Sequence, residues 1–334
     1  MSFHKSRICF GLAVLLVVCM AAATWTEPAQ AEPGRAKYVF LMIGDGMGAP
    51  QRAATEFYLH SLAGEDTKQP GIQKLLMNRF PAHGMTATFA QNAIITDSAA
   101  AGTAIACGRK TASGVVCMDA NRTESFPTIA ELAKEHGMKV GIVSSVSIDH
   151  ATPACFYAHA PSRSDYYGIA VQLAKSDFDY FGGGAAKGAL PGKTDGRESP
   201  VEIARRNGFN IAQTREELAA LQPGDNAWAF NHTCDSSAAL FYEIDRPDDH
   251  ISLAEFTRKG IELLDNPDGF FMMVEGGKID WACHANDAAT AIADTIAFDE
   301  AIAEAFEFYR EHPEETLIVV TGDHECGGMS IGFA

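Results

Sequence analysis

The chain has 334 residues and a formal net charge of −17, from 43 acidic and 26 basic residues. This charge argues against a nucleic-acid-binding surface and favours a soluble protein. The length suffices for one large domain or two small ones with an ample core. An acidic chain can still bind phosphate groups where divalent cations reverse the local charge.

The N-terminus has the features of an export signal. Lys5 and Arg7 form a basic start, residues 8–23 are apolar, and residues 29–31 form an Ala-Gln-Ala cleavage site. The apolar run is too short for a comfortable membrane span, and no second run follows. We therefore expect residues 1–31 to be a signal peptide and the mature protein to be periplasmic or secreted, free of the membrane.

Six cysteines remain after removal of this segment. An even number in an exported chain permits disulfides. Cys107 and Cys117 would close a short loop that contains two glycines, so they are the first pair that we expect to be bridged.

The first apolar run, residues 37–43, predicts a buried strand of a parallel sheet. It leads into Gly44-Asp45-Gly46, which puts a carboxylate at the strand tip between glycines that let a ligand approach the backbone. A tight turn with local hydrogen bonds from Asp45 is the alternative.

Residues 86–89 predict a second strand, and residues 94–98 lead into an Ala-rich helix. Asp97 and Ser98 would lie at the start of this helix, where free N–H groups favour anions. A Ser at this position is commonly only an N-cap. It becomes a nucleophile if a metal lowers the pKa of its hydroxyl.

A helix over residues 126–137, with Ile129 and Leu132 facing inward, precedes a strand over residues 139–145. Past that strand lie His150, Thr152 and Arg163. An Arg that points into a crevice can hold a phosphate through two parallel hydrogen bonds, although Arg163 could also be an ordinary surface charge.

Residues 178–181 predict a further strand, and residues 185–225 a peripheral excursion without chemistry. No repeat or low-complexity linker marks a second domain. Four further helices are predicted near residues 201–206, 214–221, 253–264 and, as a long crossover helix, 287–309.

The densest chemistry lies in residues 270–284. Residues 270–274 predict a buried strand, and Glu275, Asp280 and His284 follow it. Aspartate oxygens and a histidine nitrogen suit zinc, whereas a solvated loop with a capping Asp is the alternative.

A last strand, residues 316–321, ends at Asp323 and His324. The strands and helices together predict an α/β fold, a three-layer αβα sandwich around a large, mostly parallel central sheet. In such sheets ligands bind at the carboxyl ends of the strands, where these polar residues would gather.

Five segments in this order resemble the alkaline phosphatase family, whose superfamily also holds sulfatases and phosphodiesterases. They are IGDGMG at 43–48, TDSAAAGT at 96–103, HATP at 150–153, VEGGKIDWACH at 274–284 and TGDH at 321–324. The resemblance implies a metal-dependent hydrolase of phosphate monoesters with broad specificity, and it leaves homodimer formation open.

The resemblance also implies roles for single residues. Ser98 would be the nucleophile that forms a phosphoserine, and Arg163 would clamp the phosphate oxygens, with Asp97 orienting it. Two zinc ions and one magnesium ion would share the ligands as follows: Asp45, Asp323 and His324 for one zinc, Asp280 and His284 for the other, and Asp45, Thr152 and Glu275 for magnesium.

The second zinc would then have two protein ligands, whereas zinc sites ordinarily have at least three. In the family the third is a His from a segment beyond the last strand seen here. We therefore expect residues 32–334 to be a catalytic domain that lacks its C-terminal part. Cys283 and Cys326 lie close to proposed zinc ligands in the sequence. They could form a disulfide or bind zinc, but buried free thiols are the simpler expectation.

Two alternatives remain. A phosphodiesterase or sulfatase of the same superfamily is one, although Ser98-Ala99-Ala100 lacks the sulfatase C/S-x-P-x-R context. A non-catalytic carrier of metal or phosphate is the other. A carrier would need the ligands without a nucleophilic hydroxyl, so the Ser98→Ala variant separates it from an enzyme.

Overall fold

The structure is a computed structural model that describes residues 36–64 and 74–332, and the expected signal peptide lies outside these ranges. Its strands are β1 (Tyr38–Gly44), β2 (Lys139–Ser144), β3 (Tyr180–Gly183), β4 (Asn210–Ala212), β5 (Ala227–Phe230), β6 (Phe270–Gly276) and β7 (Thr316–Gly322). They form one sheet in the order β4-β5-β3-β2-β6-β1-β7, and every neighbouring pair is parallel.

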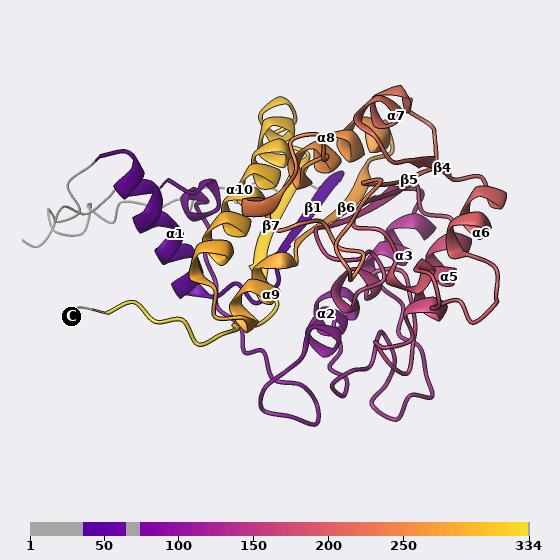
Figure 1. The fold of residues 1–334 in the computed structure, drawn as a ribbon, viewed down its shortest axis with the longest axis horizontal. Helices are drawn as coiled ribbons and strands as arrows, with labels where there is room; N and C mark the ends of the chain where they lie inside the picture. Colours follow the sequence, from indigo (N-terminus) through magenta and orange to yellow (C-terminus); the bar gives the residue numbers. More distant parts are fainter. Residues whose placement is uncertain (1–35, 65–73, 333–334) are drawn as a thin grey trace, which may run out of the picture. The chain divides into compact units, whose positions relative to one another are not determined.

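Helices cover both faces of this sheet, which confirms the predicted α/β class and its three layers (Figure 1). The α-helices are α1 (Ala49–Leu62), α2 (Ser98–Cys107), α3 (Ile129–Glu135), α4 (Ala151–Ala154), α5 (Tyr166–Lys175), α6 (Pro200–Arg206), α7 (Arg215–Ala220), α8 (Leu253–Leu264), α9 (Lys278–His284) and α10 (Ala288–Glu311). Short 3-10 helices are η2 (Leu76–Arg79), η3 (Lys187–Ala189) and η4 (Glu243–Asp245).

Strand β1 shows how the two cores form. Successive side chains of a strand point to opposite faces. Phe40 and Met42 therefore pack into the core that contains residues of α8 and α10. Leu41 and Ile43 pack into the other core, with residues of α2, α3 and α5. A strand buried on both faces has to be apolar throughout, which is why residues 38–43 form a continuous apolar run.

The ends of the three strands β6, β1 and β7 lie level with one another. Gly44 pairs with Gly276 of β6 and with Gly322 of β7. Residues that flank these glycines in the sequence therefore emerge at one place, at the carboxyl edge of the sheet. This register brings together side chains that lie far apart in the chain.

Local capping sets the limits of the helices near this edge. Asp97 caps α2 by accepting a hydrogen bond from the Ala100 N–H at 3.1 Å. Ser252 and Glu255 form a reciprocal capping box at the start of α8, whose bounds match the predicted helix. A capping residue fixes where the first turn starts, so Ser98 becomes the first residue of α2.

Three sequence predictions about local structure are wrong. Residues 86–89 are not a strand, so Ser98 does not follow a strand end. Helix α3 buries Ala130 and Ala133, whereas Ile129 and Leu132 are exposed, because the helix packs its small residues closely. The segment 185–225 is not wholly peripheral, since it contributes β4 to the edge of the sheet.

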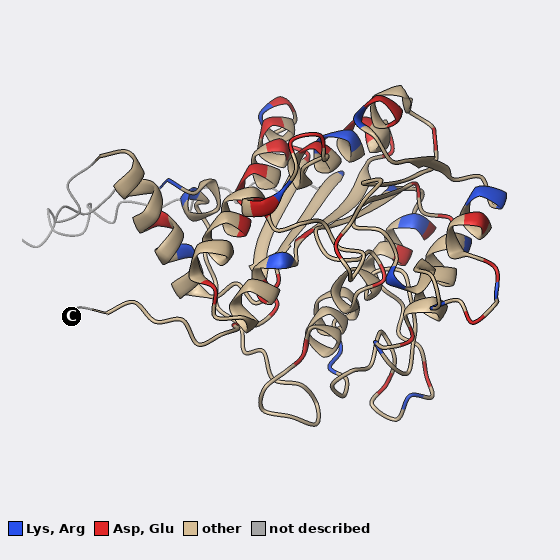
Figure 2. Ribbon diagram, viewed as in Figure 1, with Lys and Arg blue, Asp and Glu red and all other residues tan. Residues whose placement is uncertain are grey.

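The structure also shows where the charged residues lie and whether the cysteines are paired. Figure 2 shows basic residues scattered over separate elements and acidic residues along α10. No described helix is long and apolar enough to span a membrane. All six described cysteines are free, so the bridge expected between Cys107 and Cys117 is not formed in this structure.

Candidate active site

Three carboxylates meet where β1, β6 and β7 end. Asp45 and Asp323 each follow the last residue of a strand, and Glu275 is the penultimate residue of β6. All three side chains are at most 2% exposed. The Gly46 N–H donates a hydrogen bond of 3.1 Å to Asp323 Oδ1, which connects the tips of β1 and β7.

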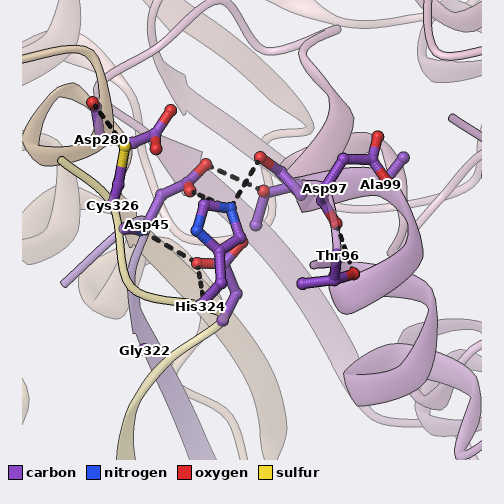
Figure 3. A network of polar contacts seen from close by, with 12 residues as sticks. Asp45, Thr96, Asp97, Ala99, Asp280, Gly322, His324 and Cys326 are labelled. Atoms are coloured by element: carbon purple, nitrogen blue, oxygen red, sulfur yellow. Dashed lines mark hydrogen bonds and ion pairs between the residues drawn. The ribbon is translucent and has the colours of Figure 1, made fainter. Parts of the chain in front are cut away.

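His324 joins two of these carboxylates into the first group that could hold a metal ion. Its Nε2 lies 3.3 Å from Asp45 Oδ1 and 3.5 Å from Asp323 Oδ2. Figure 3 shows the His324 ring between Asp45 and the start of α2. The structure thus brings together the three residues that the resemblance assigned to one zinc.

A second group gathers around the other oxygen of Asp45. Thr152 Oγ1 donates to Asp45 Oδ2 at 3.2 Å, and the Ser144 hydroxyl donates to Glu275. His150, Asp45 and Glu275 have ligand atoms within 4.8 Å of one another. The sequence had placed His150 near this edge without assigning it a role as a ligand.

A third group lies beside the first. Asp280 and His284 occupy successive turns of α9, with His284 Nε2 3.5 Å from Asp280 Oδ2. Cys326, from the loop after β7, completes a group whose three ligand atoms lie within 4.8 Å of one another. Figure 3 shows the Cys326 sulfur next to Asp280.

The donor atoms of these groups fit divalent cations. One oxygen each of Asp45, Glu275, Asp280 and Asp323 is buried and accepts no hydrogen bond from the described residues. Buried polar atoms are ordinarily paired, so four unpaired carboxylate oxygens at one place indicate missing positive charge. Carboxylates with one imidazole suit zinc, and carboxylates with hydroxyls suit magnesium.

Burial and the crowding of like charges raise the pKa values of Asp45, Glu275 and Asp323. Burial, and then the neighbouring Asp323 and Asp280, raise the pKa of Asp45 well above its usual range. Burial and Asp45 likewise raise the pKa of Glu275, and burial raises the pKa of Asp323 to about 7. A bound cation would reverse this effect by favouring the charged carboxylates.

Ser98 faces the first group. It is 4% exposed, and its Oγ lies 3.4 Å from His324 Nε2. As the first residue of α2 it sits among backbone N–H groups without intrahelical acceptors, and the helix dipole also favours an anion there. The hydroxyl therefore lies between a candidate metal group and a region suited to negative charge.

The Arg163 guanidinium is held at both ends by hydrogen bonds. Nη1 donates to Asp97 Oδ2 at 2.9 Å, and Nη2 donates to His150 Nε2 at 3.1 Å. Burial, Arg163 and Lys187 lower the pKa of His150 to about 3, so the ring is neutral and can accept. Asp97 also accepts from the Gly114 N–H at 3.0 Å.

Lys278 is a neighbour that the sequence analysis did not single out. Its side chain is 1% exposed, and its Nζ lies 2.8 Å from Asp235 Oδ2. The ammonium also lies 3.8 Å from the centre of the Tyr242 ring and 4.6 Å from that of Trp281. In the sequence, the one signal for Lys278 is its position directly after two glycines, between Glu275 and Asp280.

The chain matches the family model described as alkaline phosphatase over residues 36–333. It is 31% identical to streptomycin-6-phosphate phosphatase of Streptomyces griseus, over 93% of this chain and 78% of that protein. It is 32% identical to alkaline phosphatase 3 of Bacillus subtilis, over 89% of this chain and 62% of that protein. Human tissue-nonspecific alkaline phosphatase is 33% identical, with 86% and 63% covered.

Solved structures agree with these matches. The cold-active alkaline phosphatase of Shewanella sp. superposes with a TM-score of 0.77 at 33% identity, over 88% of this chain and 70% of that one. Alkaline phosphatase from the Antarctic bacterium TAB5 gives 0.76 at 31% identity, with 88% and 81% covered. The chain thus spans about two thirds of several relatives, and it belongs to the alkaline phosphatase family.

Proposed function

We propose that this protein hydrolyses phosphate monoesters to an alcohol and inorganic phosphate through a phosphoserine formed on Ser98. The carrying observation is that a buried serine at a helix N-terminus lies 3.4 Å from His324, beside carboxylates with unpaired oxygens. Membership of the alkaline phosphatase family supports the same class of reaction.

The residues divide into ligands and groups that act on the phosphate. Asp45, Asp323 and His324 would hold one zinc, Asp280 and His284 a second, and Asp45, Thr152 and Glu275 a magnesium ion. When bound, such cations lower the pKa of a neighbouring hydroxyl and stabilise charge on the entering and leaving oxygens.

Ser98 and Arg163 would carry out the displacement. Ser98 Oγ bonds to phosphorus as the bond to the alcohol oxygen breaks, and the alcohol leaves with a proton. Arg163 holds non-bridging phosphate oxygens, and Asp97 keeps its guanidinium in place through the 2.9 Å hydrogen bond. Water then attacks the phosphoserine, so the serine hydroxyl is restored and phosphate leaves.

Ser98→Ala tests this function, with Thr96→Ala as the matched control. Thr96 is the nearest other hydroxyl in this segment, but it donates to the Asp97 carbonyl and precedes the helix. We expect Ser98→Ala to lose phosphoenzyme and hydrolysis of a chromogenic monoester, at unchanged metal content, while Thr96→Ala keeps both. Labelled phosphate trapped on another residue of the wild-type protein would contradict the assignment. Faster hydrolysis of a diester would favour a phosphodiesterase.

We also propose that the protein acts in the periplasm or outside the cell. The support is the basic, apolar and Ala-Gln-Ala pattern of residues 1–31. N-terminal sequencing of the exported protein tests it, and an intact start at Met1 would contradict it.

A further inference from the structure

We propose that Lys187 is a specificity-determining residue, whose ammonium binds a second anionic group on the alcohol part of the substrate. The substrate class would then be phosphate monoesters whose alcohol also bears a phosphate or a carboxylate. The inference rests on the proposed function, because it assumes that the ester phosphate binds at Ser98 and Arg163. Neither the motifs nor the comparisons assign a role to Lys187.

Hydrogen bonds tie the backbone of Lys187 to the residue that precedes His150. The N–H groups of Lys187 and Gly188, in the short helix η3, donate to the two oxygens of Asp149 at 2.9 and 2.7 Å. Asp149 is fully buried. The next residue, His150, accepts from Arg163 at 3.1 Å. The start of η3 is therefore held close to the arginine that would bind the phosphate.

The side chain of Lys187 is fixed by the start of α5. Its Nζ lies 4.5 Å from the centre of the ring of Tyr166, the first residue of this helix. An aromatic face attracts an ammonium at such a distance. The two segments pack closely, because a Cβ on Gly188 would lie only 2.5 Å from the Tyr166 carbonyl oxygen. Since Tyr166 follows Arg163 by one helical turn's length of chain, the ammonium and the guanidinium belong to one region.

The charge of Lys187 acts on the site. Burial, Arg163 and Lys187, in this order, lower the pKa of His150 to about 3. Interactions between charges weaken with distance and with screening by water. The effect on a buried ring therefore agrees with an ammonium that lies near His150.

Lys187 differs from the other basic residues around His150 in having no acidic partner. Arg163 lies 2.9 Å from Asp97, and Lys278 lies 2.8 Å from Asp235. Within the described part of the chain, the ammonium of Lys187 contacts the Tyr166 ring and forms no ion pair. In a chain with a net charge of −17, an unpaired cation beside a phosphate-binding arginine is suited to an anion from outside.

The anion at Lys187 would have to come from the rest of the substrate, because Arg163 would hold the ester phosphate. Both basic side chains are partly exposed, so a substrate could reach both. An ammonium is a compact point charge without the fork geometry of a guanidinium. It accepts a phosphate or a carboxylate alike, so the spacing between the two anionic groups would set the preference.

Phosphate esters of straight-chain alkanediols test the inference. For chains of two to six carbons, kcat/KM is measured for the bisphosphate and for the monophosphate, with the metal-loaded full chain. Two equivalent phosphates give a statistical factor of about two. We expect the bisphosphate to be preferred about fivefold beyond this factor at one or more chain lengths, the effect of one partly exposed ion pair. The preference should shrink as salt is added.

Three variants locate the charge. Lys187→Met should reduce the ratio of the two kcat/KM values to the statistical factor, and Lys187→Arg should keep most of the preference. Lys193→Met is the matched control, because it removes the same charge from an exposed residue of the same segment. It should keep the ratio of the wild-type protein. Circular dichroism and metal content are checked for each variant.

Three results would overturn the inference: a wild-type ratio at the statistical factor for every chain length, a preference that survives in Lys187→Met, or an equal loss in Lys193→Met. If Lys187→Met does not fold, the wild-type salt dependence decides, since a preference that salt does not reduce would exclude an ion pair.

Calorimetric binding of the same esters to Ser98→Ala gives the comparison without turnover. Hydrolysis of the monophosphates without the preference overturns the role of Lys187 alone. A preference in binding that depends on Lys187, in a protein that hydrolyses no monoester, overturns the proposed function alone.

Discussion

The two sides of the site around Ser98 differ in how far the chain itself satisfies its charges. On one side, Asp45, Glu275, Asp280 and Asp323 each keep a buried oxygen that accepts no hydrogen bond from the described residues. On the other side, Asp97 accepts hydrogen bonds from Arg163, Gly114 and Ala100. The unpaired oxygens of the first side support the cations that we propose there, whereas the Asp97 carboxylate of the second side is hydrogen-bonded within the described residues.

This difference separates two ways of preparing a site. Burial opposes ionisation of Asp97, but Arg163 and the backbone donors outweigh it and lower the pKa of Asp97. Burial and like charges instead raise the pKa of Asp45. The arginine side is therefore organised by folding alone, whereas the carboxylate side would be organised by the cations that we propose it binds.

Metal removal should have the largest effect on the difference between the two sides, because it acts on the carboxylate side alone. A chelator leaves the crowded carboxylates uncompensated, so we expect a lower melting temperature and no hydrolysis. At cation concentrations about a thousandfold above the dissociation constant, binding contributes about 4 kcal/mol to the free energy of unfolding. Calorimetry with and without added zinc measures the change. An unchanged melting temperature after verified removal of metal would contradict the interpretation of the unpaired oxygens.

A matched pair of substitutions sharpens the comparison in the metal-free protein. Asp97→Asn removes a satisfied carboxylate and should lower the free energy of unfolding by about 1–3 kcal/mol. Asp45→Asn removes a repelled one and should raise it, on the order of 1 kcal/mol. Urea denaturation at about pH 8, where free carboxylates are charged, measures both. The same sign for both variants would remove the distinction between the two sides.

The effect of Asp97→Asn should also depend on pH. Because the folded pKa of Asp97 is lowered, its contribution is present above the unfolded value of about 3.9 and is lost as pH falls through the folded value. The difference between wild type and Asp97→Asn should therefore shrink below about pH 4. A difference that stays constant into acid would point to packing rather than to charge.

Trp281→Lys gives the smallest expected effect. The Trp281 ring packs edge-on against His150, with ring centres 5.7 Å apart, and supplies no charge to the site. An added ammonium should hold product phosphate more tightly and lower its inhibition constant about fivefold, or ~1 kcal/mol. Trp281→Gln is the neutral control, since both variants lose the ring over Lys278. Equal constants in the two variants would exclude a charge effect.

Much of the fold could be predicted because burial leaves a clear pattern. Strands β1, β6 and β7 are apolar runs, and α8 carries its capping box in the sequence. Residues 86–89 were wrongly predicted as a strand because threonine and phenylalanine favour strands. In the structure they are exposed and pair with no strand of the described residues. The inward face of α3 was predicted wrongly, because the helix buries the small residues Ala130 and Ala133 rather than its larger apolar neighbours.

The site could be predicted only in part. Asp45, Glu275 and Asp323 follow from their places at strand ends, since parallel strands bring their carboxyl ends to one edge. Cys326 and Lys278 could not be found in this way, because their neighbours depend on how the loop after β7 and helix α9 pack. Distances across 46 positions, from Cys326 to Asp280, are set by tertiary structure and leave no local pattern.

The level ends of β1, β6 and β7 also bear on how the protein folds. Gly46 and Asp323, whose hydrogen bond joins two of these ends, are 277 positions apart in the chain. Contacts of such high sequence separation form slowly, because a long loop has to close first. We therefore expect the carboxylates to meet late in folding. We expect cations to slow unfolding more than they speed folding, so the loaded site would lengthen the lifetime of the native state.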